Sequence, residues 1–205
     1  SVAKKASSVV AGSLSAYGFE NYSNERIRQS LNLVAINLGK TCVDYILVEM
    51  LQNVKIAHFM LEAANITNKP LMLGFTLLKR DGKIMLRRDD KEFTPEIIEQ
   101  IISKGKNVKV VGIMHTNISL LEESLNVLTQ VWKGPVILYP DSGVFRDFVW
   151  HCDESTYSEI VDTLVDMIKK FPQIEIVGGC CGLGPEFIGI LRQRIKMIDD
   201  PLKFI

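Results

Sequence analysis

The strongest constraint on the fold is a regular alternation between short apolar runs and longer segments with helical periodicity. The apolar runs are rich in Val, Ile and Leu and predict six strands, at 8–14, 43–50, 71–77, 108–114, 135–139 and 174–177. Most show no alternation of polar and apolar residues, so we expect strands that are buried on both faces. The segments between them place apolar residues at helical spacing, at 24–38, 54–64, 94–103, 119–132, 155–171 and 185–194.

Six strand–helix units in a row predict parallel strands with right-handed crossovers, and hence an α/β fold. A doubly wound sheet is complete with five or six strands, whereas a (β/α)8 TIM-type barrel has eight and typically about 250 residues. The count favours the open sheet. However, polar residues end all six strands, and a barrel gathers such residues at one mouth. They are Ser13, Glu49, Thr76, His115, Asp141 and the pair Cys180 and Cys181. We therefore predict a single partial domain over residues 1–205, a TIM-type barrel that is incomplete at its N-terminus.

Composition and charge exclude several classes of partner. The 24 basic and 24 acidic residues cancel, so the chain lacks the electrostatic footprint of a nucleic-acid-binding protein. No window approaches the roughly 18 consecutive apolar residues of a membrane helix. Residues 1–8 have no apolar stretch typical of a secretory signal, and the four cysteines do not form a disulfide framework. We therefore expect a cytoplasmic protein.

Local signals add detail to this organisation. Thr94 followed by Pro95 predicts the start of a helix, with threonine as the cap. Ser119 with Glu122 three residues later predicts a capping box. The charged stretch at 79–91 predicts a loop over the mouth of the barrel.

The densest chemical signal is Ile-Val-Gly-Gly-Cys-Cys-Gly-Leu-Gly-Pro-Glu at 176–186. Adjacent residues of a flat strand point to opposite faces, so Cys180 and Cys181 could not bind one ion there. The two glycines before the pair and Gly182 after it allow a sharp turn that brings both thiolates to one side. Tetrahedral Zn²⁺ would then need one more protein ligand and keep a position for substrate. The alternative is that the two cysteines simply pack at a strand end.

His115 is the candidate for the third ligand, because it closes the strand at 108–114 and faces the same mouth. Its alternative role is a hydrogen-bonded histidine at the rim. His58, in the middle of a helix, and His151, in the loop at 145–154, are weaker candidates.

The substrate candidates also follow strands. Glu49 ends a mostly apolar strand, where a carboxylate needs a partner such as a ligand ammonium, or else a neighbouring lysine. Amides around Gly182, at the start of a helix, could bind a carboxylate. Ser142 lies in the turn Tyr-Pro-Asp-Ser-Gly at 139–143. Tyr17 either lines an apolar pocket or packs.

Val-Gly-Gly-Cys-Cys-Gly-Leu-Gly-Pro-Glu at 177–186 closely resembles the zinc-binding signature of homocysteine S-methyltransferases. The segment at 10–18 is similar to the family's glycine-serine strand, and 44–49 to the strand that carries a substrate-binding glutamate. Leu-Tyr-Pro-Asp-Ser-Gly at 138–143 resembles the family's Tyr-Pro-Asn-Ser-Gly. The resemblance implies a (β/α)8 barrel, a zinc cofactor, and methyl transfer from a small donor to homocysteine, giving methionine. The family's donors are S-methylmethionine, S-adenosylmethionine, betaine or a folate–cobalamin system.

Two departures from the family stand out. Gly112-Ile-Met-His115 places a histidine where the family has its first zinc cysteine. Two thiolates and a neutral imidazole make the zinc site neutral, which predicts a more acidic but less nucleophilic substrate thiol. The family's opening strands, with an Asp-Gly motif and a threonine that contact substrate, have no counterpart in the sequence.

Three interpretations follow from these departures. The chain is a fragment, or a second chain or homo-oligomer completes the barrel, or the protein is a silent member that binds a thiol amino acid or a partner subunit without turnover. A further possibility is an open sheet whose cysteine turn binds an anion and no metal.

Overall fold

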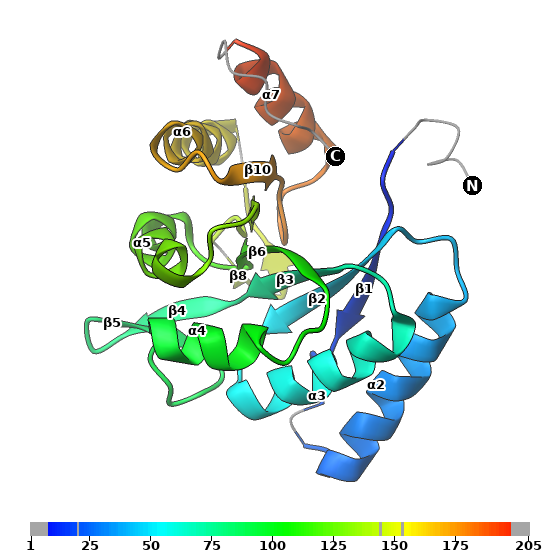
Figure 1. Ribbon diagram of the computed structural model, residues 1–205. Helices are drawn as coiled ribbons and strands as arrows, with labels where there is room; N and C mark the ends of the chain where they lie inside the picture. The colour runs from blue at the N-terminus through cyan, green and yellow to red at the C-terminus, as the bar shows by residue number, and fades with distance from the viewer. Residues whose placement is uncertain (1–7, 20, 144, 153, 198–205) are drawn as a thin grey trace.

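A sheet of six parallel strands forms the centre of the computed structural model, which describes residues 8–19, 21–143, 145–152 and 154–197 (Figure 1). The strands are β1 (Ala11–Ser15), β2 (Tyr45–Leu51), β3 (Leu71–Phe75), β6 (Val108–Met114), β7 (Val136–Tyr139) and β10 (Ile174–Val177). They pair in chain order, β1-β2-β3-β6-β7-β10, and every pairing is parallel. The predicted α/β fold is therefore confirmed.

One helix follows each strand, and the helices pack on the same face of the sheet. They are α2 (Asn24–Gly39), α3 (Val54–Ala64), α4 (Pro95–Ile102), α5 (Leu121–Val131), α6 (Glu154–Lys170) and α7 (Pro185–Lys196). The larger apolar core joins helix residues such as Leu31 and Phe187 to strand residues such as Leu73. Figure 1 shows these helices along the outer side of the row of strands. A doubly wound sheet has helices on both faces and a reversal in its strand order, so this sheet is not doubly wound.

A second, smaller cluster fills the other face of the sheet. Its buried members all come from strands: Met72, Val110, Met114, Ile137 and Tyr139. Successive strand residues thus alternate between the two cores, as the pleat requires. Strands β3 and β7 are buried along their whole length, which confirms the prediction of two-sided burial for them. In β1 exposed and buried residues alternate instead, and among the described residues no strand pairs with its outer edge.

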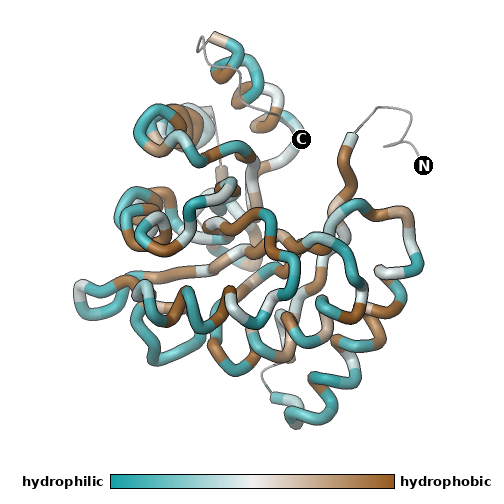
Figure 2. The backbone as a smooth tube through the Cα atoms, viewed as in Figure 1, coloured by the Kyte–Doolittle hydropathy of each residue, from teal (hydrophilic) through white to brown (hydrophobic). Residues whose placement is uncertain are grey.

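The boundaries of several elements agree with those predicted from the sequence periodicity. In Figure 2 the strands are mainly hydrophobic (brown), whereas hydrophobic and hydrophilic (teal) residues alternate along the helices. Strands β6 and β10 and helix α3 have the predicted bounds. Thr94 caps α4 as predicted, accepting a hydrogen bond from the Ile97 amide (3.4 Å). The capping box at Ser119 is wrong. The Asn117 side chain accepts from the Ser119 amide (3.0 Å) and starts a 3-10 turn, so α5 begins only after Leu120.

The stretch at 79–91 was predicted as a loop, and the structure corrects this. It forms an antiparallel hairpin of β4 (Leu77–Arg80) and β5 (Lys83–Leu86). The turn residues Asp81 and Gly82 both have positive φ (51° and 78°), the geometry that an Asp-Gly pair favours. A second hairpin, β8 (Phe145–Arg146) with β9 (Val149–Trp150), follows β7. Both hairpins extend from the carboxyl ends of sheet strands.

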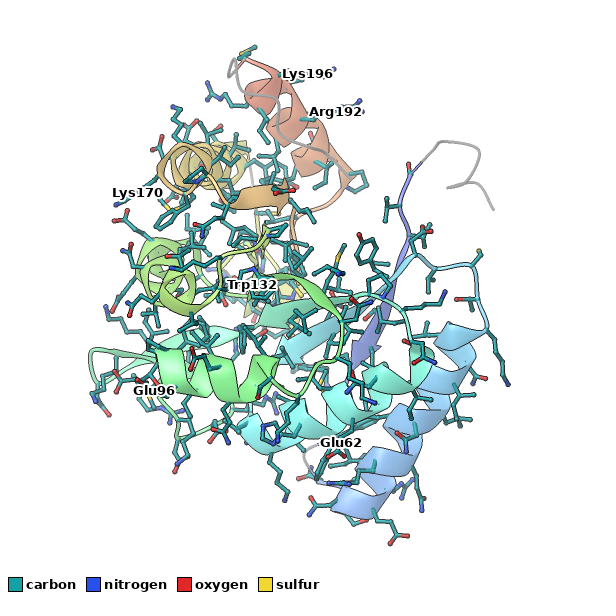
Figure 3. All side chains as sticks on the ribbon, viewed as in Figure 1. Glu62, Glu96, Trp132, Lys170, Arg192 and Lys196 are labelled. Carbon is teal, nitrogen blue, oxygen red and sulfur yellow. The ribbon has the colours of Figure 1, made fainter. Side chains whose placement is uncertain are left out.

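The described acidic and basic side chains of the helices are exposed. Those labelled in Figure 3, including Glu62, Glu96 and Lys170, are exposed on the helices. Among the described residues, no helix combines the length and the apolar run that crossing a membrane requires.

Candidate metal centre and substrate pocket

The turn between β10 and α7 carries the adjacent cysteines. The Cys180 amide donates to the Pro140 carbonyl (2.8 Å), and the Ser142 amide donates to the Cys181 carbonyl (2.9 Å). Gly182 then adopts a left-handed φ of 81°, a conformation that favours glycine. These contacts hold the turn against the loop after β7. As a result the two sulfur atoms lie 3.8 Å apart instead of on opposite faces of a strand.

The glycines around the pair serve different purposes. A Cβ on Gly179 would lie 2.5 Å from the Leu183 Cβ, so this position needs glycine for close packing. A Cβ on Gly178 would make an ordinary contact of 3.7 Å with Tyr139. Among these three positions, the sharp turn therefore depends on the left-handed conformation of Gly182.

His115 reaches the cysteines from the end of β6. Its φ of 41° is unusual for a residue with a side chain. Its amide donates to the Tyr139 carbonyl (3.1 Å), which secures this conformation. The imidazole Nδ1 lies 3.6 Å from the Cys180 Sγ, and Trp150 packs against the ring edge-to-face at 5.5 Å. One ligand atom from each of His115, Cys180 and Cys181 lies within 4.8 Å of the others.

These distances match the edges of a tetrahedral zinc site. Zinc–sulfur bonds of about 2.3 Å and a zinc–nitrogen bond of about 2.0–2.1 Å place two sulfurs about 3.8 Å apart and a sulfur and a nitrogen about 3.6 Å apart. The structure has 3.8 Å between the sulfurs and 3.6 Å from Cys180 to His115. Thiolates and imidazole are also ligands that suit zinc. The residues present therefore fit the ion.

Burial affects the protonation of two of the three candidate ligands His115, Cys180 and Cys181 (the trio). Burial, followed by the neighbouring Cys181 thiol, raises the pKa of Cys180 to about 12. Burial and the Arg87 charge lower the pKa of His115, while Asp141 opposes them by raising it. Near neutral pH the Cys180 thiol is protonated and the imidazole is neutral, so an ion that binds must displace the Cys180 proton.

We predict that zinc affinity rises steeply with pH. Release of the Cys180 proton strengthens apparent binding by about 10-fold per pH unit at pH values below its raised pKa of about 12. The His115 imidazole adds no further proton above its own lowered pKa. Competition titrations against a chromophoric chelator between about pH 6 and 8, corrected for the chelator's own protonation, measure the slope. A flat profile would show that the Cys180 thiol is not a ligand.

The trio lines a cavity of about 420 Å³, a size typical of small-ligand sites. The other lining residues are Tyr17, Glu49, Met50, Gln52, Arg87, Arg88, Met114, Phe145 and Trp150. Glu49 comes from β2, and its Oε2 accepts a hydrogen bond from the Ser13 hydroxyl of β1 (2.5 Å). Next to Glu49, the β2–β3 register shifts and Met50 has a φ of 60°, which ends regular pairing at the cavity wall.

The structure brings most of the predicted site residues together. His115, Cys180, Cys181, Glu49 and Tyr17 all line the cavity. The other two predicted substrate contacts, Ser142 and Gly182, lie beside each other at the turn that carries the cysteines. In the described part of the chain, the two weaker histidine candidates, His58 and His151, do not join the cluster of possible ligands.

Sequence reasoning missed the two arginines after β5. Arg87 donates from Nη1 to the His115 carbonyl (3.1 Å) and lies 3.8 Å from the Asp141 carboxylate. Asp141 is 4% exposed, and its Oδ2 lies 3.6 Å from the His115 Nδ1. The available signal in the sequence was the pair of adjacent arginines in the charged stretch at 79–91. Their position at the cavity could be assigned only from the β4–β5 hairpin that precedes them.

Comparisons with known proteins identify the family and the fold. A sequence model of the family described as homocysteine S-methyltransferase matches residues 1–195. Similar solved structures include the homocysteine methyltransferase MmuM from Escherichia coli in its apo form (TM-score 0.70, 21% identity) and its metallated form (TM-score 0.66, 19% identity). The alignments cover 93% and 91% of this chain but 64% and 61% of MmuM, so this chain spans less than two thirds of that protein.

The carboxyl transferase domain of pyruvate carboxylase from Rhizobium etli also has a similar fold (TM-score 0.52, 10% identity). That alignment covers 92% of this chain and 35% of the domain's chain. At these identities the solved structures show the fold. The family match extends over nearly the whole sequence, and by it this chain belongs to the homocysteine S-methyltransferase family.

Proposed function

We propose that this protein transfers a methyl group to the thiol of homocysteine, giving methionine, at a zinc ion held by His115, Cys180 and Cys181. The observation that carries the proposal is the spacing of the candidate ligand atoms in a cavity that also contains Glu49. The distances from the Cys180 sulfur to the Cys181 sulfur and to the His115 Nδ1 both match edges of a tetrahedron. Family membership supports homocysteine as the acceptor. The similarity to MmuM, which has been solved in a metallated form, supports a metal.

Several residues of the cavity have a proposed task. A divalent ion held by His115, Cys180 and Cys181 would favour the thiolate form of the substrate thiol, whose proton would pass to solvent. Glu49, oriented by the Ser13 hydroxyl, binds the ammonium of homocysteine. The substrate sulfur then bonds to the donor's methyl carbon as the bond from that carbon to the donor's sulfur or nitrogen breaks. The electron pair of the broken bond stays with the leaving group.

The remaining sequence candidates are proposed as secondary contacts. Tyr17 forms part of the cavity wall. The Ser142 hydroxyl is buried and has no hydrogen-bond partner among the described residues, and it lies against Gly182. The Ser142 amide already donates to the Cys181 carbonyl (2.9 Å), so the substrate carboxylate is left to the amides around Gly182 or to another donor.

We also propose that the fold is six units of a (β/α)8 barrel. Strands in chain order with helices on one face are the arrangement found in such a barrel. In the described residues, β1 and β10 each leave one edge unpaired. Two further strand–helix units, from the same protein, a second copy or a partner subunit, would close the sheet and complete the cavity wall.

The unpaired edges also favour a second candidate function, that of a silent family member. Such a protein would bind a thiol amino acid or a partner subunit without turnover. His115 in place of the family's first zinc cysteine would make the zinc site neutral and the bound thiol less nucleophilic, which supports this candidate. A silent member would bind homocysteine as the enzyme does, but it would form no methionine.

A panel of methyl donors separates the two functions. We expect zinc-loaded protein to form methionine from homocysteine with at least one of S-methylmethionine, S-adenosylmethionine, betaine or methylfolate with cobalamin. Removing the metal with a chelator should abolish the product, and restoring zinc should recover it. Mass spectrometry of the product is the measurement. Homocysteine binding with no methionine from any donor would instead favour the silent member.

A further inference from the structure

The cavity beside the metal candidates carries charges of both signs. Among its described lining residues, Glu49 is acidic and Arg87 and Arg88 are basic. An α-amino acid also carries one charge of each sign. If Glu49 binds the ammonium, the carboxylate needs a cationic or amide donor on another wall, and the Ser142 amide is already engaged.

Arg87 is fixed beside the metal candidates. Its Nη1 donates to the carbonyl of His115 (3.1 Å), and its amide donates to the Thr76 carbonyl (3.0 Å). The Asp141 carboxylate lies at 3.8 Å, too far for a strong hydrogen bond. A guanidinium has five N–H donors in a planar fork, so several remain available for a ligand. The side chain is 37% exposed, so those donors are accessible.

The two arginines differ in position. The Arg88 guanidinium lies over the ring of Tyr17 at 5.5 Å from its centroid, and Tyr17 is 62% exposed. Arg88 is thus at the outer rim, and it also lines a neighbouring cavity between the starts of α2 and α3. Arg87 lies next to His115, one of the candidate ligands, and lines the same cavity as Glu49.

Resting on the proposed function, we propose that Arg87 binds the carboxylate of the thiol substrate and makes the site select an amino acid over a simple thiol. Arg87, in the β5–α4 connection, then binds the substrate carboxylate, and Glu49 of β2 binds the substrate ammonium. The substrate sulfur points to His115, Cys180 and Cys181. A charge-assisted arginine–carboxylate contact is specific in geometry as well as strong.

Direct binding of three thiols to zinc-loaded protein tests this assignment. The ligands are homocysteine, its decarboxylated analogue (an aminopropanethiol) and its deaminated analogue (a sulfanylbutanoate). Arg87→Gln should weaken binding of homocysteine and of the sulfanylbutanoate by about 10- to 100-fold, the range of one charge-assisted hydrogen bond. The aminopropanethiol should bind with its wild-type affinity. Arg87→Lys should recover part of the loss, because it restores the charge but not the fork.

Controls separate recognition from support of the fold. Arg80→Gln, on the same hairpin but outside the cavity lining, should change no affinity. Zinc content and thermal midpoint are measured for every variant. Equal weakening of all three ligands, loss of zinc in Arg87→Gln, or a carboxylate-specific loss in Arg88→Gln instead would overturn the role of Arg87. Zinc-loaded wild type that binds none of the thiols would refute the proposed function itself.

Discussion

Replacing Cys180 with serine is expected to remove stoichiometric zinc from the purified protein. The Cys180 sulfur lies 3.8 Å from the Cys181 sulfur and 3.6 Å from the His115 Nδ1, so it shares an edge of the tetrahedron with each of them. Structural zinc sites bind with about 10–16 kcal/mol, or roughly 3–5 kcal/mol per protein ligand if there are three. Losing one ligand should therefore weaken zinc binding by at least about 100-fold.

Metal content after gel filtration and competition with a chromophoric chelator measure this effect. Cys42→Ser is the matched control, because Cys42 is an exposed free cysteine between α2 and β2. It should retain wild-type zinc and affinity. Circular dichroism checks that both variants fold. If Cys180→Ser keeps full zinc, or if folded wild type binds none at all, the metal proposal fails.

Replacing Gly112 with alanine is expected to be among the most destabilising single substitutions in the chain. A Cβ at this position would lie 1.7 Å from the Ile137 carbonyl oxygen and 2.6 Å from its carbon. Gly112 and Ile137 are paired across β6 and β7, so the clash is with backbone that cannot move without breaking the ladder. We expect a loss of roughly 3–5 kcal/mol in the free energy of unfolding, or failure to fold.

The consequence extends to the site, because β6 leads into His115 and β7 into Asp141. Urea unfolding followed by circular dichroism gives the change in stability. Gly189→Ala is the control in α7, where a Cβ meets nothing within 4 Å. This exposed helical position should gain about 0.5–1 kcal/mol from the better helix former. A Gly112→Ala variant with the wild-type urea midpoint would contradict the packing argument.

Much of the fold follows from local pattern, as particular elements show. The mostly apolar run of β6 and the helical spacing of α3 are long and regular, so their bounds were predicted correctly. Thr94 with Pro95 is a short-range start signal that needs no tertiary partner. Ser119 shows the limit of such signals, because Asn117 competes for the same amide and wins. The β4–β5 hairpin was missed although its Asp81-Gly82 turn is a recognised signal.

Some residues of the candidate site could likewise be assigned from the sequence, and others only from the structure. The double cysteine between glycines was a complete local signal, and Glu49 stood out as a carboxylate ending an apolar strand. Arg87 could not be assigned from sequence, since its role depends on a hairpin that returns it to the His115 carbonyl. The engagement of the Ser142 amide by the Cys181 carbonyl was likewise visible only in three dimensions.

The sequence by itself determined the order of strand–helix units and the paired thiols at a glycine turn, because periodicity and backbone freedom act over a few residues. Tertiary structure decided which histidine meets the thiols, which arginine shares their cavity and which face of the edge strand stays exposed. His115 and Cys180 are 65 positions apart in the chain. Their approach to 3.6 Å depends on the mutual register of β6, β7 and β10, which packing across the whole sheet determines.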